Sequence, residues 1–243
     1  MGTIAGLQIP KLAALQDTAQ LSAARKQSSQ KTALNLELAK YAPAFGFNNV
    51  LSNWIFLQFL QYFGGDELRQ QFGYQLSANF FEAILEKDPY YRDFYLFLSG
   101  SATLYAGQPE EAVALMANGL ENLGPQQPPD SFYIWRYKGT DELLFLGDVQ
   151  AAQQSYAMAA EWASQSSYVD GVLISEISQN MAQVLSQNPD STAVKISAWS
   201  GVLSNALDDT ARARATQEIR NLGGDVIQTP EGPYKIVFPN EDE

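Results

Sequence analysis

The sequence predicts an all-α protein in which antiparallel helix pairs stack as a short solenoid, with a small β-hairpin near the C-terminus. Apolar residues recur at spacings of three and four along most of the 243 residues, which is the period of a helix that buries one face. A glycine followed by polar residues and an alanine occurs twice, at 106–112 and at 146–152. Glycine closes one helix, the polar residues start the next, and alanine lets two helices approach closely. This repetition predicts helix-turn-helix units.

The composition excludes several classes of function. The chain has a net charge of -12 and contains neither cysteine nor histidine. An acidic surface repels phosphate backbones, so we expect no nucleic-acid partner. Without cysteine and histidine the chain cannot form disulfides, thiolate nucleophiles, imidazole acid–base pairs or zinc sites with these ligands.

Residues 1–46 are predicted to form an N-terminal helix and a linker. The first ten residues are mildly apolar but too few to span a membrane. They are either the remnant of a longer membrane anchor or a native terminus. Residues 11–31 have the spacing of an amphipathic helix. We expect its basic residues Arg25, Lys26 and Lys31 to be solvated, with a membrane or an acidic partner as the alternative.

The next two segments differ sharply in polarity. Residues 32–47 contain three leucines that alternate with polar residues, followed by the helix breakers Pro43 and Gly46, so we predict a loop or a broken helix. Residues 50–63 are apolar at nearly every position. A helix with apolar residues all round is usually buried on several sides, and we therefore expect this one to be central in the fold.

The boundaries of the remaining helices are predicted from helix-breaking glycine and proline residues and from residues that cap helix ends. A helix after Gly64 and Gly65 should continue to about Lys87, where Asp88 and Pro89 end it. Two helix pairs and three further helices are predicted beyond it, separated by the proline-rich loop 124–130. These helices are 90–105 with 110–123, 131–146 with 149–164, and then 172–185, 193–207 and 210–222. Residues 226–229 and 234–238 are predicted to form the hairpin or an extended tail.

The turn sequence resembles the tetratricopeptide repeat, which has glycine at the inter-helix turn, alanine five residues later, an aromatic residue four beyond it, and a second alanine after three more. Gly147, Ala152, Tyr156 and Ala159 match this pattern best. At the preceding turn, Gly107 and Ala112 match, with Met116 and Gly119 in the aromatic and second alanine positions. The two turn glycines are 40 residues apart, against the usual 34. We expect Ala152 and Ala159 to be buried between paired helices.

The resemblance covers about 47–163 and suggests how the chain is divided. Residues 47–164 would be degenerate repeats, 165–224 capping helices, and 225–243 an extended tail or hairpin. The stretch is also loosely similar to bacterial tetratricopeptide-like proteins that carry an N-terminal membrane anchor. This likeness implies a bacterial protein whose soluble helical part is held on one side of a membrane.

In the tetratricopeptide family, the first helix of each pair lines a concave groove. Transferring that pattern by position gives nine candidate partner-binding residues. They are Ile55, Phe59, Tyr62, Phe97, Ser101, Leu104, Tyr137, Asp141 and Leu144. The family's clamp for C-terminal carboxylates uses lysine and asparagine, and none of the nine is either. The alternative is that the helices fill their own groove and these aromatic residues form the core.

These features predict a binding protein rather than an enzyme. The pairs Glu110–Glu111 and Asp208–Asp209 are adjacent carboxylates at predicted helix starts, where acidic residues are common, so they carry no sign of catalysis. We expect no metal and no cofactor. The favoured function is a non-catalytic protein-protein interaction scaffold, an assembly or tethering factor of a membrane complex, associated through its N-terminus. The alternative is a helical module that encloses a small apolar ligand or lipid.

Overall fold

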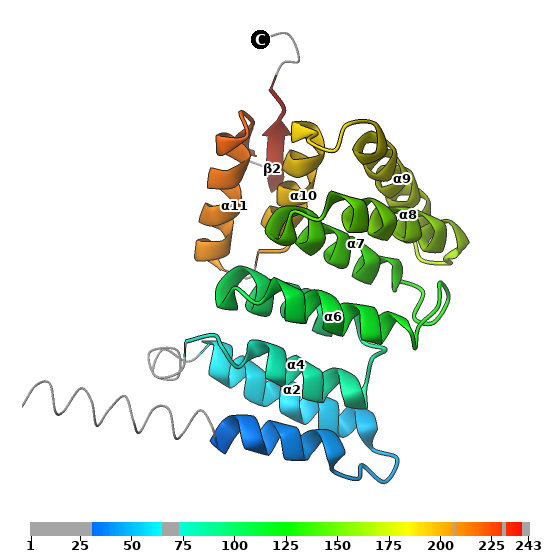
Figure 1. Ribbon diagram of the computed structural model, residues 1–243, viewed down its shortest axis with the longest axis vertical. Coiled ribbons are helices and arrows are strands. Elements are labelled where there is room, and N and C mark those ends of the chain that lie inside the picture. Colours follow the sequence, from blue (N-terminus) through cyan, green and yellow to red (C-terminus); the bar gives the residue numbers. More distant parts are fainter. Residues whose placement is uncertain (1–30, 65–72, 207, 230–231, 240–243) are drawn as a thin grey trace, which may run out of the picture.

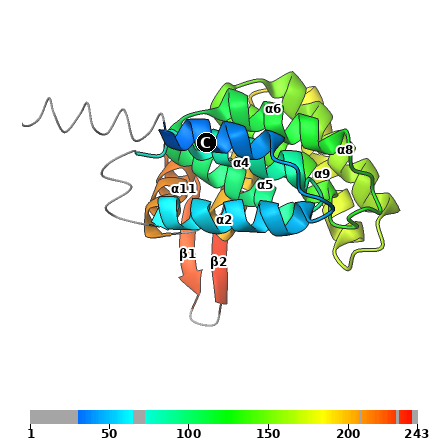
Figure 2. The same ribbon diagram turned by 90° about the horizontal axis from the view of Figure 1, so that it is seen from below.

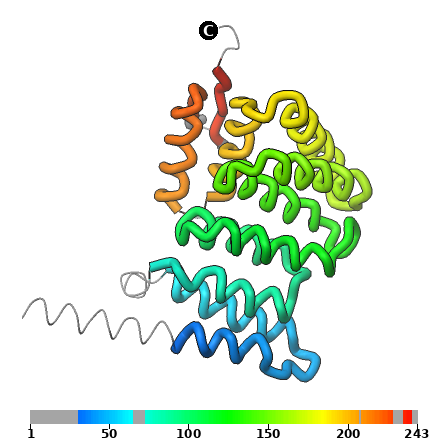
Figure 3. Tube along the Cα trace, in the orientation of Figure 1, coloured from blue at the N-terminus to red at the C-terminus, as the bar shows by residue number. Residues whose placement is uncertain are grey.

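A computed structural model describes residues 31–64, 73–206, 208–229 and 232–239 of the chain. The described part is mainly helical, and helices that follow each other in sequence pack against one another (Figure 1). The two ends of the described chain lie at opposite ends of the stack, with helix 31–41 at one end and the hairpin at the other (Figure 3). The predictions of an all-α fold and of a C-terminal hairpin are confirmed.

The labelled elements begin after helix 31–41. They are α2 (Asn48–Gly64), α4 (Ser77–Lys87), α5 (Arg92–Leu98), η1 (Ser99–Ala106), α6 (Pro109–Leu120), α7 (Phe132–Asp141), η2 (Glu142–Leu146), α8 (Val149–Gln165), α9 (Gly171–Gln187), α10 (Thr192–Ser204), α11 (Asp209–Asn221), β1 (Asp225–Thr229) and β2 (Gly232–Val237). The segments η1 and η2 are π-helical extensions of α5 and α7.

The two predicted turns are built as the sequence suggests. Gly107 and Gly147 have left-handed φ angles of 68° and 67°, which glycine adopts without strain. Pro109 occupies the first turn of α6, where its missing N–H costs nothing. The carboxylate of Asp148 accepts a hydrogen bond from the N–H of Ala151 at 3.0 Å and caps α8.

The first helical segment refines one prediction. Of the loop and the broken helix predicted for 32–47, the structure has the broken helix: residues 31–41 are helical, and the segment around Pro43 and Gly46 is irregular. Lys40 fixes this helix to α4 through an ion pair with Glu82 at 2.6 Å. Leu36 is buried, while Leu34 and Leu38 stand on another side of the helix. The alternating leucines therefore reflect opposite helix faces, not a strand.

Helix α2 corrects a second prediction, because only one of its faces is buried. Ile55 and Phe59 are in the core, whereas Val50, Trp54 and Leu57 are each more than half exposed. A uniformly apolar sequence does not say which face meets the core. The helix is thus peripheral and presents apolar side chains outward.

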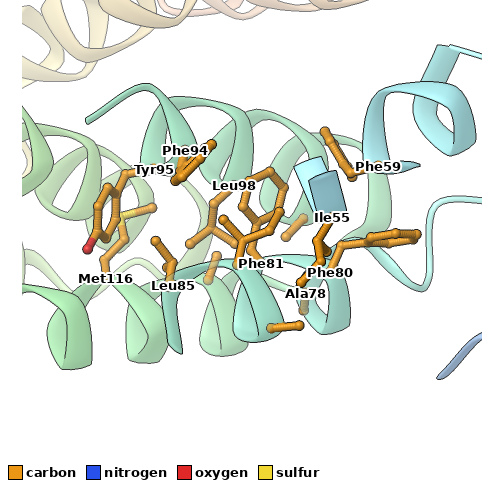
Figure 4. Close-up of a cluster of buried hydrophobic side chains, with 14 of the residues drawn as sticks. Ile55, Phe59, Ala78, Phe80, Phe81, Leu85, Phe94, Tyr95, Leu98 and Met116 are labelled. Carbon is orange, nitrogen blue, oxygen red and sulfur yellow. The ribbon is translucent and has the colours of Figure 1, made fainter. Parts of the chain in front are cut away.

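An aromatic core extends from helix 31–41 and α2 through α4 and α5 to α7. The ring centroids of Phe59 and Phe81 are 4.6 Å apart and the rings meet edge to face, a favoured aromatic geometry. The ring centroids of Phe56 and Phe94 are 5.0 Å apart, and these two rings are tilted at 55° to each other. Figure 4 shows Phe59, Phe81 and Phe94 converging with aliphatic residues from neighbouring helices. The cluster continues through α6 to α7, where it ends at Ile134.

The connection from α2 to α4 also differs from expectation. The predicted helix 66–87 is shorter, because Gly73 has a left-handed φ of 60° and α4 begins only at Ser77. Residues 65–72 lie outside the described part of the chain. The hydroxyl of Tyr62 donates to the carbonyl of Gly73 at 2.9 Å and accepts from the N–H of Leu76 at 3.1 Å. This side chain therefore fixes α2 to the turn before α4.

Small residues allow close helix packing in the second half of the stack. Ala152 and Ala159 on α8 are fully buried, as predicted. Helix α8 packs against both α7 and α9. Helices α10 and α11 pair next, and the antiparallel hairpin β1–β2 places Val226 and Ile236 against them. The hairpin thus covers the C-terminal apolar cluster.

We expect Ala152→Leu to destabilise the protein by ~1–3 kcal/mol, because three extra carbons have no space at this contact. The matched control is Ala157→Leu, on the exposed side of the same helix, with an expected change within about 0.5 kcal/mol. Urea unfolding followed by circular dichroism measures both. Equal stability of Ala152→Leu and the parent would contradict the packing of α8.

Candidate functional site

A pocket lies on the inner side of the stack, where the first helices of two pairs face the C-terminal helices. It has a volume of about 140 Å³, and we call it the concave pocket. Its lining comes from α5, η1, α7, α9, α10 and the start of α11, together with the loop before α11. The lining residues are Leu96, Ser99, Gly100, Leu104, Tyr105, Tyr133, Arg136, Tyr137, Thr140, Ile174, Gly201, Val202, Asn205, Ala206 and Ala211.

Most of the wall is apolar, and the polar groups in it are concentrated on α7. Tyr133, Tyr137 and Thr140 follow at spacings of four and three, so they share one face of this helix. The rings of Tyr133 and Tyr137 stack with centroids 6.3 Å apart. Burial raises the pKa of Tyr133 to about 12 and also raises the pKa of Tyr137. Both phenols are therefore neutral at physiological pH.

Arg136 is the cation in the pocket wall. Its Nη1 donates to Ser178 Oγ at 2.8 Å. Among the described residues, no carboxylate lies within 4.0 Å of its guanidinium, whereas Arg92 pairs with Asp93 and Asp130. Burial lowers the pKa of Arg136, because removing the guanidinium from water disfavours its charge. The pocket thus holds a half-buried, partly desolvated cation without a counterion from the described chain.

A buried carboxylate lies behind the pocket. Asp141 is 1% exposed, and its two oxygens accept hydrogen bonds from Ser99 Oγ and Thr103 Oγ1, both at 2.8 Å. Burial raises the pKa of Asp141 to about 7, although the two hydroxyls lower it. The bonds join the end of α7 to η1, so they connect two consecutive helix pairs next to the pocket wall.

The neighbouring carboxylate has different partners. Glu142 is also buried, but it accepts a hydrogen bond from Ser155 Oγ at 2.6 Å and forms an ion pair with Lys138. Asp141 and Glu142 therefore point to different helices. They act as separate packing contacts.

Five of the nine predicted groove residues are buried and do not line an open surface. These residues are Ile55, Phe59, Tyr62, Ser101 and Asp141. The reason is that α4 and α6 pack closely against α2, α5 and η1, so the inner side of the first pairs is filled by the aromatic core. These five side chains therefore belong to the packed interior of the described chain.

The other four residues are partly exposed, and two of them reach the pocket. Phe97 packs on Phe56, with ring centroids 5.1 Å apart. Leu144 packs against the C-terminal apolar clusters. Leu104 and Tyr137 line the concave pocket. Of these four residues, Leu104 and Tyr137 thus lie at the concave pocket, while Phe97 and Leu144 contribute to packing.

The sequence analysis did not identify Arg136, although a signal is present. Lys138 has an acidic residue four positions later, and their side chains form an ion pair. Arg136 has no acidic residue three or four positions away on either side. A basic residue without a helical counterion, on the same helix as several tyrosines, could have been singled out on this basis.

Comparison with known proteins gives no match to a protein-family model, a curated protein or a solved structure. None of the described helices is both long and apolar enough to cross a membrane. In the described ranges, no three acidic side chains cluster as a metal site would require.

We expect the pH dependence of stability to depend on Asp141. Its pKa of about 7 in the folded protein lies above the ordinary value of 3.8 for an aspartate, so its contribution to stability is complete below pH 4 and is lost as the pH rises through 7. Asp141→Asn cannot ionise. Relative to the parent, this variant should gain about 2–4 kcal/mol between pH 4 and pH 8, in urea unfolding measured at each pH.

Asp190→Asn is the matched control, because the Asp190 side chain is 97% exposed. Its stability curve should run parallel to that of the parent across the same pH range. If the curve of Asp141→Asn were also parallel to that of the parent, Asp141 would not hold its proton in the folded protein.

Proposed function

We propose that the protein is a non-catalytic binding module whose concave pocket takes a small organic carboxylate with a compact apolar body. The observation that carries this proposal is Arg136, a desolvated cation without a carboxylate partner in the described chain, set in an apolar wall. A buried charge without a counterion costs several kcal/mol. A ligand that brings a carboxylate would remove this cost and would therefore bind preferentially.

The geometry of the guanidinium favours a carboxylate over a neutral polar group. Arg136 uses Nη1 for Ser178, which leaves other N–H groups for a ligand. Arginine holds carboxylates with charge-assisted hydrogen bonds that are about twice as strong as neutral ones. The hydroxyl of Tyr133 already donates to Asp170 at 3.3 Å. The neutral phenol of Tyr137 can donate a hydrogen bond to a ligand without repelling an anion.

The volume limits the size of the apolar body. A cavity of about 150 Å³ in another protein holds one benzene molecule, and the concave pocket has about 140 Å³. A single aromatic ring or a branched aliphatic chain therefore fits, whereas a long acyl chain does not. Leu96, Leu104 and Ile174 would contact this body.

Phenylacetate is a suitable probe, with phenylacetamide as its neutral analogue. We expect calorimetry to show that the parent prefers the carboxylate and that Arg136→Met weakens phenylacetate binding about 10- to 100-fold, since a hydrogen bond to a charged group is worth about 1.5–3 kcal/mol. Binding of phenylacetamide should be unchanged. Arg220→Met, a change at an exposed arginine, should leave both affinities unchanged.

Equal weakening of both probes in Arg136→Met would mean that the substitution deforms the pocket. Equal binding of both probes by the parent would mean that Arg136 does not select an anion. Either result would argue against a carboxylate ligand.

The predicted protein-protein interaction scaffold is a second candidate function. It is favoured by the side chains at the concave pocket, since tyrosine and arginine are enriched at interface hot spots. A partner side chain would enter the concave pocket beside Tyr133, Arg136 and Tyr137. Association with a membrane complex through residues 1–30 remains a prediction, because those residues lie outside the described part of the chain.

For this second function we expect Tyr137→Ala to reduce partner capture, because truncating a hot-spot residue costs about 2 kcal/mol or more. Affinity capture with the full chain, followed by mass spectrometry, compares the variant with the parent. Tyr90→Ala, at an exposed tyrosine away from the pocket, should capture normally. Phe97 is unsuitable for this test, because its ring packs on Phe56 and Phe59. Normal capture by folded Tyr137→Ala would contradict a partner at this pocket.

The likeness to tetratricopeptide repeats is part of the same proposal. It is supported by the left-handed glycines at both turns and by the buried Ala112, Ala152 and Ala159. Two features differ from the ordinary repeat: the spacing of 40 residues and the π-helical ends of the first helices. We therefore propose a degenerate member of that architecture.

A further inference from the structure

An exposed apolar surface covers the N-terminal end of the described stack. Helix 31–41 contributes Leu34, Leu38 and Tyr41, and α2 contributes Val50, Trp54 and Leu57, all of them more than half exposed. We call these six residues the N-terminal apolar face. In each helix the three residues are spaced by four and three positions, so they form a stripe along one side. Figure 2, which views the stack from this end, shows both helices in front.

The turn between helix 31–41 and α2 adds an exposed phenylalanine ring and an open hollow to this face. Phe45 is 86% exposed and has a left-handed φ of 47°, a conformation that bulky residues rarely adopt. Next to this turn, Phe47, Val50, Leu51 and Trp54 line an open hollow of about 320 Å³. A strained backbone that presents an exposed aromatic ring is more common at binding sites than elsewhere.

Charge distinguishes this face from the rest of the protein. The net charge of the chain is -12, yet α2 has no charged residue in its 17 positions. On helix 31–41, Lys40 pairs with Glu37 and with Glu82 of α4, so these two carboxylates are partly neutralised. Two copies of an acidic protein repel each other at most relative orientations. At α2 they can approach without bringing acidic side chains of that helix together.

The size of the face matches a stable interface. A large side chain that is more than half exposed contributes roughly 100 Å², so the six residues, together with Phe45 and Phe47, expose on the order of 800 Å². This is about the area that each partner buries in a standard protein-protein interface. It also exceeds the few hundred Å² of contiguous apolar surface that monomers usually expose.

We propose that the N-terminal apolar face is an interface between two copies of this chain. Helical stacks need terminal units with a polar outer side, because each unit buries the apolar side of its neighbour. This end of the described stack is apolar, and a second copy would cover it. In a two-fold arrangement the same face meets itself, and Phe45 of each copy can enter the hollow of the other. The interface is separate from the concave pocket.

The test uses the full chain and measures its mass in solution by sedimentation equilibrium between about 1 and 100 µM. We expect the parent to be a dimer and Trp54→Glu with Leu57→Glu to be a monomer. Two carboxylates per copy at the contact should weaken dimerisation by at least about 100-fold. Because both side chains are exposed, the helical circular-dichroism signal should not change.

The matched control is Val172→Glu with Leu173→Glu on α9, where two exposed apolar residues are also replaced. This variant should dimerise like the parent. A parent that remains monomeric at about 100 µM, or a face variant that still dimerises, would overturn the proposal. The proposal would also be overturned if the parent were a monomer that bound phosphatidylcholine vesicles through Trp54 and Leu57, because the face would then be a lipid contact.

Discussion

The carboxylate of Asp141 joins two consecutive helix pairs from inside the protein, and the shape of the concave pocket depends on this link. Its partners, Ser99 and Thr103, are both on η1. A buried carboxylate that lost these partners would be destabilised by several kcal/mol, so η1 cannot move away from α7. Ser99 and Thr140, next to these contacts, form part of the pocket wall. The same bonds that stabilise the core therefore position the site.

The π-helical ends of the first helices belong to this arrangement. The N–H of Gly107 donates to the carbonyl of Ala102, and the N–H of Gly147 donates to the carbonyl of Glu142. Such wide turns are uncommon and are frequent at functional sites. Here they occur at the same position in both repeats, and Leu104 and Tyr105, on η1, line the pocket. Because both α5 and α7 end in a π-helical segment, these wide turns are a regular feature of the fold and not a local irregularity of one helix.

Features that depend on the identity of neighbouring residues, such as turns and close helix contacts, could be predicted from the sequence. Features that depend on packing between helices distant in sequence could not. Gly107, Gly147 and Ala152 have distinctive local roles, so the turns and the close contact at α8 followed from their identities. The exposed face of α2 did not, because every side of that helix is apolar and only the position of α4 decides which side is buried. Arg136 has a local signal, since no acidic residue lies three or four positions away, but its place in a pocket wall depends on the packing of distant helices.

Net charge explains why the two proposed contacts use different chemistry. An acidic protein repels both an anionic ligand and a second copy of itself at long range, and salt screens that repulsion beyond about 10 Å. Binding must therefore rest on short-range interactions. In the concave pocket, Arg136 acts within apolar walls, where screening by water is weak. At the N-terminal apolar face, the absence of charge on α2 removes the repulsion at the contact itself. Both proposed contacts thus rely on short-range interactions that operate despite the acidic net charge.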